Sequence, residues 1–301
     1  MTRPDVSVVI VSWNTRALTL ACLASLPAAA RAHRLEVWVV DNASTDGSVD
    51  AIRRAHPDVQ VVANTENVGF AAANNQGVAR GSGRYVMLLN SDTVAPPGAI
   101  DALVGFADAH PGAGVVGPRL VNPDGTYQSG PTPFPSLWNE TLAVTGLGRR
   151  LLTPAYPSAP AHRALVARQA DYVGGACMLA RRDAIAQVGG LDEGYFMYSE
   201  EPDWCWRMRR AGWDVWYTPD AEIIHHGGQS TSQQRHAMTI ALYRSKVRFL
   251  RRYRGAATAR AAAAVFVIAS RLRRAIGRLL GHPSGLALRP SDLDTSAHPG
   301  S

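Results

Sequence analysis

The chain has 301 residues, 46% hydrophobic and 18% charged, a composition typical of a globular protein with a sizeable core and not of a disordered one. Its net charge of +7 comes from the C-terminal part: residues 1–222 carry 18 Arg against 22 Asp and Glu, whereas residues 223–291 carry 13 Lys and Arg and no acid. Because residues 1–222 have a net negative charge, they do not form the basic surface that a nucleic-acid partner requires. The three scattered cysteines form no CxxC pair, which argues against a disulfide framework and a zinc site.

The first half of the chain alternates predicted strands and helices. Residues 6–11 form a continuous apolar, β-branched run, as expected of a strand buried on both faces of a parallel sheet. This order predicts an α/β fold with a mostly parallel central sheet flanked by helices. The further strands are expected at 36–40, 59–63, 85–89 and 115–116, and the helices at 16–30, 71–80 and 96–110, with one more that ends at 55.

The alternation ends after residue 122. Residues 123–168 contain many prolines and little periodicity, which predicts a long surface loop. A pair of strands is expected in 171–180, another strand at 215–217, and helix from about residue 236. We therefore expect a domain at residues 1–235, a basic amphipathic helical extension at 236–281 and a disordered tail at 282–301.

Polar clusters follow several of the predicted strands, at the edge where open parallel sheets bind ligands. They are Asp41-Asn42, the pair Asn67 and Asn74, and Asn90-Ser91-Asp92. Each one taken alone is explained equally well as a turn and helix cap. Asp92 has no Lys or Arg near it in the sequence, which suits a hard divalent cation that takes its other ligands from water and phosphate.

A further cluster places Glu200, Glu201 and Asp203 within four residues. Such acids repel one another unless a cation or a proton relieves them, although they also suit the acidic first turn of a helix. A carboxylate here acts as a general base if it reaches an acceptor hydroxyl. His225 and His226 add imidazole ligands for a metal, and at most one of the two binds, because adjacent side chains of a strand point apart.

Other common catalytic motifs are absent. There is no GxxxxGK[ST] loop, no GxGxxG after the first strand and no GxSxG elbow. The order of the motifs that are present resembles inverting family 2 glycosyltransferases with a GT-A fold, and among them the bacterial rhamnosyltransferases that build cell-wall and surface polysaccharides. The resemblance covers residues 6–254. It rests on segments 8–14, 40–48, 67–71, 88–92, 173–177, 190–193, 198–207 and 225–230.

The resemblance implies a nucleoside-diphosphate sugar donor and a divalent metal, Mg²⁺ or Mn²⁺. Asp92 and His225 would bind the metal, with His226 the less favoured histidine. Ser91 stands where the family often has Asp or Pro, so the motif offers a single carboxylate. The residues that would bind the donor nucleotide are Ser12, Asn14, Asp41, Asn67 and Asn90, with Asp41 at the pyrimidine base.

By the same resemblance, Glu201 is the catalytic base, and Glu200 and Asp203 support the acceptor and its loop. The reaction would be a single displacement with inversion at the anomeric carbon. L-Rhamnose from dTDP-rhamnose is the expected donor, and a UDP-sugar such as UDP-galactofuranose is the alternative.

Two other classes of protein remain open on the residues alone. A nucleotidyltransferase would share the metal carboxylates but usually has a Gly-rich basic loop after the first strand, where this chain has Ser12-Trp-Asn-Thr-Arg16. A non-catalytic carbohydrate-binding module would have no need of three acids beside a metal site. Metal-dependent turnover of a sugar nucleotide separates both classes from a glycosyltransferase.

The basic extension predicts a membrane partner. Residues 243–254 and 270–280 mix cations with apolar residues at helical spacing, which favours binding to an anionic membrane surface; the alternative is a solvated helix whose Arg stems cover its apolar face. No apolar stretch reaches the roughly 20 residues of a spanning helix, and no signal-peptide layout is present. We therefore expect a cytoplasmic enzyme at the inner face of the membrane, acting on a lipid-linked or polysaccharide acceptor.

Overall fold

The β-branched run at the start of the chain forms the central strand β1 of a mixed sheet. The structure is a computed structural model that describes residues 3–153, 155–229, 231–279 and 286–295. The sheet order is β3-β2-β1-β4-β9-β6-β10-β5, with β7 paired to β6 and β8 to β10. The strands are β1 (Val6–Ser12), β2 (Leu35–Asp41), β3 (Gln60–Ala63), β4 (Tyr85–Asn90), β5 (Thr93–Val94), β6 (Ala113–Val121), β7 (Tyr127–Ser129), β8 (Arg168–Gln169), β9 (Cys177–Arg181) and β10 (Asp214–His225).

Strands β1 to β4 are parallel, as the alternation of strands and helices predicts. β9 then runs antiparallel between β4 and β6, and β10 is parallel to β6. The helices are α1 (Arg16–Ala29), α2 (Ser48–Ala55), α3 (Phe70–Arg80), α4 (Ala99–Ala109), α5 (Leu137–Thr145), α6 (Leu147–Leu151), α7 (Arg182–Val188), α8 (Glu200–Arg210), α9 (Arg235–Arg254) and α10 (Ala256–Leu279), with 3₁₀ turns at Ala161–Leu165, Thr231–Gln234 and Pro290–Leu293.

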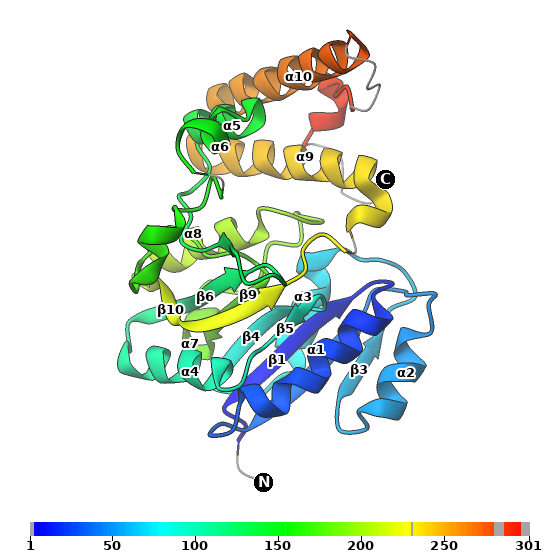
Figure 1. Ribbon diagram of the computed structural model, residues 1–301, viewed down its shortest axis with the longest axis vertical. Coiled ribbons are helices and arrows are strands. Elements are labelled where there is room, and N and C mark those ends of the chain that lie inside the picture. Colours follow the sequence, from blue (N-terminus) through cyan, green and yellow to red (C-terminus); the bar gives the residue numbers. More distant parts are fainter. Residues whose placement is uncertain (1–2, 154, 230, 280–285, 296–301) are drawn as a thin grey trace.

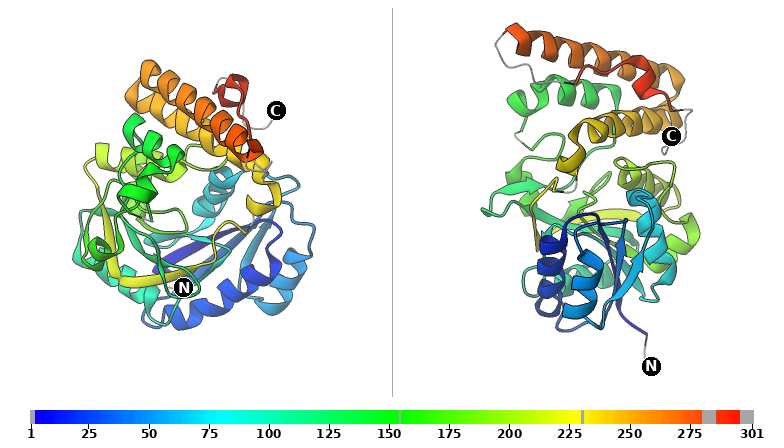
Figure 2. Two further views of the ribbon diagram at one scale, coloured as in Figure 1. Left: turned by 45° about the horizontal axis from the view of Figure 1, so that its top comes forward. Right: turned by 90° about the vertical axis from the view of Figure 1, so that its right-hand side faces the viewer.

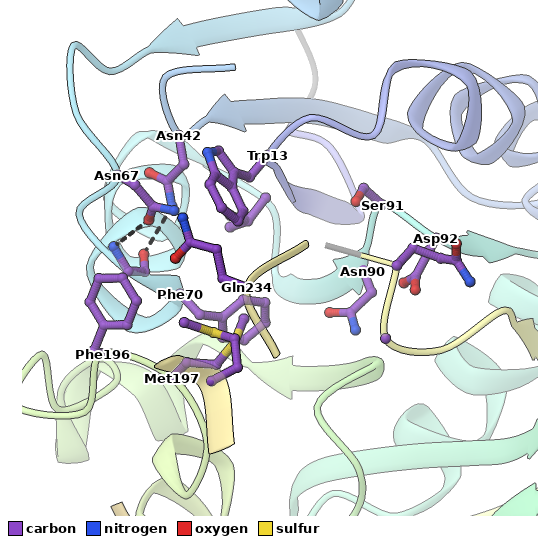
Figure 3. Close-up of a pocket in the computed structure, with 15 residues that line it drawn as sticks. Trp13, Asn42, Asn67, Phe70, Asn90, Ser91, Asp92, Phe196, Met197 and Gln234 are labelled. Carbon is purple, nitrogen blue, oxygen red and sulfur yellow. Dashed lines mark hydrogen bonds between the residues drawn. The ribbon is translucent and has the colours of Figure 1, made fainter. Parts of the chain in front are cut away.

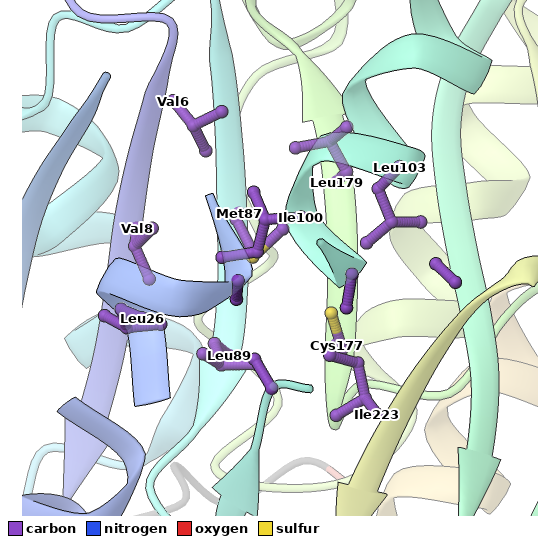
Figure 4. Close-up of a cluster of buried hydrophobic side chains, with 14 of the residues drawn as sticks. Val6, Val8, Leu26, Met87, Leu89, Ile100, Leu103, Cys177, Leu179 and Ile223 are labelled. Atoms are coloured by element: carbon purple, nitrogen blue, oxygen red, sulfur yellow. The ribbon is translucent and has the colours of Figure 1, made fainter. Parts of the chain in front are cut away.

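Helices cover both faces of the sheet (Figure 1). One face of the sheet packs on α1, α2 and α4 in an apolar cluster that includes Val8, Leu26, Met87 and Leu103 (Figure 4). The other face packs on α3, α7 and α8, where Trp204 is fully buried. Because both faces of the sheet are covered, the side chains of β1 and β4 that point to either face are mostly apolar, which explains the continuous hydrophobic runs of these two strands.

Helices α9 and α10 lie side by side at one end of the molecule, with α9 between α10 and the sheet (Figures 1 and 2). They form a third apolar cluster with α5, in which Phe266 and Leu250 are fully buried. Among the helices of the described ranges, none has both the length and the apolar character that crossing a membrane requires.

Three expectations from the sequence differ from the structure. The predicted loop of residues 123–168 contains α5 and α6: α5 packs on α10, which is distant in sequence, and α6 packs on α5. The predicted strand pair at 171–180 is the single strand β9, preceded by an isolated bridge from Tyr172 to Thr132. Of the tail expected to be disordered, residues 286–295 pack on α9 and α10 and bury Leu288 and Leu293; the remainder of 282–301 lies outside the described residues.

Candidate active site

A cavity opens at the edge of the sheet where β1, β2 and β4 end (Figure 3). Its floor is made by the polar residues that follow these strands, and its opposite side by the loop before α8 and the start of α9. Predicted site residues therefore meet others that no sequence motif had marked, Gln234 and Met238 among them. The lining residues are Val11, Trp13, Asn42, Asn67, Gly69, Phe70, Asn90, Ser91, Asp92, Phe196, Met197, Gly228, Gln229, Gln234 and Met238.

Asn42 and Asn67 form the polar part of this cavity beyond β2, and Asp41, which is not among the lining residues, precedes Asn42 at the end of that strand. Asp41 is buried, and its Oδ1 accepts a hydrogen bond from the backbone N–H of Ser44 at 2.8 Å, while Oδ2 is buried without a partner. Asn42 donates to the carbonyl of Gly69 at 3.2 Å, and Asn67 Oδ1 accepts from the N–H of Gly69 at 3.0 Å (Figure 3). The two asparagines thus hold the loop before α3 against the end of β2.

Gly69 must be glycine in this loop. Its φ of +86° lies in the left-handed region, and a Cβ there would stand 2.6 Å from the carbonyl oxygen of Phe196. The close approach brings the loop before α3 against the loop before α8. The Asn-Val-Gly motif is therefore explained by the backbone contact as well as by the cavity.

Ser12 and Asn14 do not line the cavity. Ser12 is buried in a chain of hydroxyl groups with Thr15 and Thr19, at 3.3 and 3.1 Å, and Thr15 continues it to Ser91 at 3.0 Å. The Asn14 side chain accepts from the N–H of Thr45 at 2.8 Å. Both residues hold the turns that carry lining residues, and their predicted contact with the donor nucleotide stays a prediction.

The pairing of β10 with β5 brings the predicted metal ligands together. His225 lies opposite Thr93 in this antiparallel pair, beside Asp92. Its Nε2 is 3.3 Å from Asp92 Oδ1 and 3.4 Å from Asn90 Nδ2. His226 instead donates its backbone N–H to the carbonyl of Asp92 at 2.9 Å. The structure therefore favours His225 as the imidazole ligand.

Gln128, on β7, orients the His225 ring. The Gln128 amide nitrogen donates to the carbonyl of His225 and to Asn122 Oδ1, each at 2.9 Å, so its Oε1 faces His225 Nδ1 at 2.7 Å. Nδ1 must then carry a proton, so Nε2 faces Asp92: it donates to that carboxylate when the ring is charged and offers its lone pair to a cation when the ring is neutral. No sequence signal marked Gln128, since it stands in the predicted loop, 97 residues from its partner.

The donor atoms at this point suit a hard divalent cation. Although burial raises it, the hydrogen bond and charge of His225 hold the pKa of Asp92 below its usual value, so the carboxylate is ionised. Asn90 Oδ1 is buried without a partner. Among the described residues there is no group of three His, Cys, Asp or Glu side chains that would enclose a metal. A cation here would take its remaining ligands from water or phosphate oxygens, as Mg²⁺ commonly does.

Glu201 lies at the start of α8, close to the same edge of the sheet. Its carboxyl carbon is 3.5 Å from the position that a Cβ on Gly175 would occupy. The next residue, Ala176, accepts a hydrogen bond from the N–H of Asn90 at 2.9 Å. Tyr198 and Ser199, both with φ of +68°, form the turn that directs the chain into α8. Glu201 therefore lies next to the segment whose backbone carbonyl accepts from Asn90.

The pKa values of both glutamates at the start of α8 are raised. Burial first and the neighbouring Glu201 second raise the pKa of Glu200 well above its usual value. Burial raises the pKa of Glu201 to about 7. Oε2 of each is buried without a hydrogen-bond partner. A carboxylate with a pKa near the working pH is suited to act as a general base.

Asp203 faces away from the cavity. Its carboxylate is fully buried and accepts hydrogen bonds from Arg207 Nε at 2.8 Å and from the hydroxyl of Tyr253 at 2.6 Å. Because Tyr253 lies on α9, Asp203 ties the helix that carries Glu201 to the C-terminal helices. The support that the sequence predicts Asp203 to give the acceptor would therefore be indirect, through the position of α8.

Known glycosyltransferases are similar to this chain. Residues 7–189 match the family described as Glycosyl transferase family 2. An N-acetylglucosaminyl-diphospho-decaprenol L-rhamnosyltransferase of Mycobacterium tuberculosis is 33% identical over 234 residues, 72% of this chain and 74% of that protein. The pre-mycofactocin glycosyltransferase of the same organism is 32% identical over 224 residues, 73% of this chain and 42% of that protein. The structure of the mannosyltransferase PcManGT from Pyrobaculum calidifontis, in complex with GDP-Man and Mn²⁺, has a TM-score of 0.58 at 18% identity, covering 93% of this chain and 79% of that one.

Proposed function

Since this chain belongs to glycosyl transferase family 2, we propose that it transfers L-rhamnose from dTDP-rhamnose to a hydroxyl group of a lipid-linked glycan. The family and the GT-A type fold that the sequence predicts are confirmed, and the chain is an inverting glycosyltransferase. The rhamnose donor and the lipid-linked acceptor are supported by the name of the mycobacterial relative, which matches about three quarters of both chains.

The observation that carries the proposal is a set of buried oxygen atoms without hydrogen-bond partners. They belong to Asp41, Asn90, Glu200 and Glu201, all predicted site residues at the same edge of the sheet. An unpartnered buried polar atom costs about 1–3 kcal/mol, which a bound substrate or ion offsets. These atoms are therefore available to a bound substrate or ion at this edge of the sheet.

The proposed mechanism is a single displacement. Ionised Glu201 accepts the proton of the acceptor hydroxyl as its oxygen forms a bond to the anomeric carbon. The bond from that carbon to the diphosphate oxygen breaks on the opposite face, and its electron pair leaves with the nucleoside diphosphate. No covalent sugar–enzyme intermediate is required, and the configuration at the anomeric carbon inverts.

Asp92, His225 and Asn90 would hold the Mg²⁺ or Mn²⁺ ion of the proposed reaction. When bound, such an ion acts as a Lewis acid that neutralises the charge of the departing diphosphate. The Mn²⁺ in the structure of the archaeal mannosyltransferase supports this assignment. Gln128 would then act on the metal through the orientation of His225.

We propose that residues 236–281 bring the enzyme to the cytoplasmic face of an anionic membrane. On α10, Ile268, Leu272 and Ile276 are exposed at four-residue spacing, so they form one apolar stripe along the helix. Exposed arginines flank it, among them Arg271 and Arg274. A helix with an apolar stripe between cations is typical of binding at the surface of anionic lipid.

Donor turnover by the purified protein tests the proposal. The protein is incubated with dTDP-rhamnose or several UDP-sugars, a lipid-linked acceptor, and Mn²⁺ or EDTA. We expect metal-dependent release of dTDP that is lost in Asp92→Ala and Glu201→Gln but kept in Asp58→Ala, which removes an exposed acid on a remote turn. Release of UDP instead would replace the donor by a UDP-sugar. Pyrophosphate release from a nucleoside triphosphate and a sugar phosphate would indicate a nucleotidyltransferase, and binding without turnover a carbohydrate-binding module.

A further inference from the structure

A second cavity, of about 330 Å³, lies beside the candidate active site. It is lined by α9, by the loop before α8 and by Thr295 of the C-terminal segment. Phe196 and Gln234, at the wall of the first cavity in Figure 3, line this one as well, as does Met238. The two spaces therefore share a wall, and a ligand in the second cavity would lie next to one in the first.

One face of α9 forms a wall of the second cavity. Its lining residues Ala237, Ala241, Arg244 and Arg248 stand three or four residues apart, which places them on the same side of the helix. The alanines are close in sequence to Met238 in the shared wall, and Arg244 lies about 9 Å from Met238 along the helix axis, at a rise of about 1.5 Å per residue. The cavity thus has an apolar part next to the candidate active site and a cationic part beyond it, at a separation that a sugar unit can span.

Ser245 holds this face of α9 against the candidate active site. Its hydroxyl group donates to the carbonyl of Met197 at 2.8 Å, and Met197 lines the first cavity. Ser245 itself lines the second cavity. The position of the two arginines relative to the first cavity is therefore set by a direct contact.

The two guanidinium groups have donors that the fold does not use. Arg244 donates through Nε to the carbonyl of Asp292 at 3.2 Å, and none of the described residues accepts a hydrogen bond from its two terminal nitrogens. Arg248 Nε is buried without a partner, and its Nη2 is 3.4 Å from Asp192 Oδ2, a carboxylate that also pairs with Arg252. None of the described residues that line the cavity is acidic. Because two cations four residues apart on a helix repel each other, this part of the cavity is suited to an anion.

The loop before α8 holds the Arg248 guanidinium group in place. Its Cζ lies 5.2 Å from the centre of the Tyr195 ring, in a cation–π contact. A Cβ on Gly194 would overlap this guanidinium group, so glycine at 194 leaves the space that the group occupies. Arg248 is therefore positioned before a ligand binds, which lowers the entropy cost of binding.

We propose that the second cavity binds the phosphate group that joins the acceptor sugar to its lipid, with Arg244 and Arg248 as the anion-binding residues. The inference rests on the proposed transfer to a lipid-linked glycan and assigns a binding site for that acceptor. The planar fork of an arginine donates two parallel hydrogen bonds to phosphate oxygens. A glycan without its lipid phosphate would leave both forks unpaired, so this cavity gives the enzyme its selectivity for the lipid-linked form.

A binding test needs neither donor nor turnover. Calorimetry compares geranyl diphosphate, a water-soluble prenyl diphosphate, with geraniol and with inorganic pyrophosphate, in EDTA so that no metal ion brings the diphosphate into the first cavity. We expect wild type to bind geranyl diphosphate more tightly than either comparison. Arg244→Gln and Arg248→Gln should each weaken this binding about 10–100-fold, as for a lost hydrogen bond between charged groups.

Arg251→Gln is the matched control. It removes an exposed arginine of α9 that donates to Thr295 Oγ1 at 3.0 Å, as Arg244 donates to the same C-terminal segment, but Arg251 is not among the residues that line the cavity. We expect its affinity for geranyl diphosphate to stay within about twofold of wild type. Thermal melting of each variant verifies that it is folded. Equal affinities in wild type and both cavity variants, or pyrophosphate bound as tightly as geranyl diphosphate, would overturn the proposal.

Kinetics with the lipid-linked acceptor separates this site from the donor site. Arg244→Gln should raise KM for the acceptor at least about tenfold and KM for the sugar nucleotide at most about twofold. Arg244→Lys, which keeps the charge without the planar fork, should lie between wild type and Arg244→Gln. An equal rise of both KM values in Arg244→Gln would contradict the assignment. If geranyl diphosphate binds through both arginines but no sugar nucleotide is turned over, the proposed function fails while the anion site stands.

Discussion

Replacing Gln128 by Leu is expected to weaken metal binding without unfolding the protein. The change removes the oxygen that accepts the Nδ1–H of His225 at 2.7 Å and keeps a side chain of similar size. The unpaired Nδ1–H group then favours a turned ring or a proton on Nε2 in place of Nδ1, and either change takes the Nε2 lone pair away from the cation site beside Asp92. The prediction tests the assignment of His225 as a ligand through a residue that would not touch the metal itself.

The magnitude follows from the burial of the ring and from the hydrogen bond that is lost. A buried N–H group left without a partner costs about 1–3 kcal/mol, and the His225 side chain is 15% exposed, which favours the lower part of that range. Removal of such an outer partner typically weakens metal binding by about 10–100-fold. We expect a loss close to tenfold, which corresponds to about 1.4 kcal/mol.

The assay is a titration of Mn²⁺ followed by electron paramagnetic resonance, in the presence of the nucleoside diphosphate. Gln128→Glu is the matched control, because its carboxylate still accepts the Nδ1–H, and it is expected to bind Mn²⁺ at least as well as Gln128→Leu does. Thermal melting of each variant verifies that it is folded. A dissociation constant for Gln128→Leu within about twofold of wild type, a difference below 0.5 kcal/mol, would refute the orientation argument.

Glu201→Gln is expected to lower kcat by about 10²–10⁴-fold with donor affinity unchanged in calorimetry. Since burial raises the pKa of Glu201 to about 7, from an ordinary value of 4.5, its ionisation lowers the stability of the fold as pH rises through this window. The variant should therefore melt at a higher temperature than wild type at pH 8, and an equal melting temperature would contradict this. Tyr253→Phe removes a 2.6 Å hydrogen bond to buried Asp203 and should cost about 1–3 kcal/mol in urea unfolding, against the few tenths expected if that bond is unimportant. Leu272→Ser combined with Ile276→Ser should weaken sedimentation with anionic vesicles at least about tenfold, because each buried apolar side chain contributes about 1.5–3 kcal/mol; wild-type binding would show that α10 does not insert.

The sequence alone determined those parts of the protein that depend on local patterning. The continuous apolar run of β1 and the alternation of strands and helices up to β6 are set by which residues must be buried. Asp41, Asn90 and Asp92 directly follow strands, and parallel strands end at one edge of a sheet. Their convergence is therefore a consequence of the fold class.

Contacts between distant segments decided the rest of the site. The family resemblance already favours His225 over His226 as the metal ligand, but the place of its ring beside Asp92 depends on the pairing of β10 with β5, which no local pattern specifies. Gln128 was missed because its partner is 97 residues away. The helix α5 was missed because its burial depends on α10, and a short helix with weak periodicity is stabilised mainly by tertiary packing.

The chemistry of Glu201 shows the same division. The sequence alone predicts that Glu201 stands among other acids at the start of a helix and that its carboxylate is suited to proton transfer. Burial raises its pKa, and the backbone N–H groups of Glu201 and Gly175, together with the more weakly acting Lys246, oppose that effect. Residue identity and local pattern determine which groups are available for catalysis. The tertiary structure alone decides how far each group is removed from water and which charge faces it, and the free energy of an ionised group depends on both.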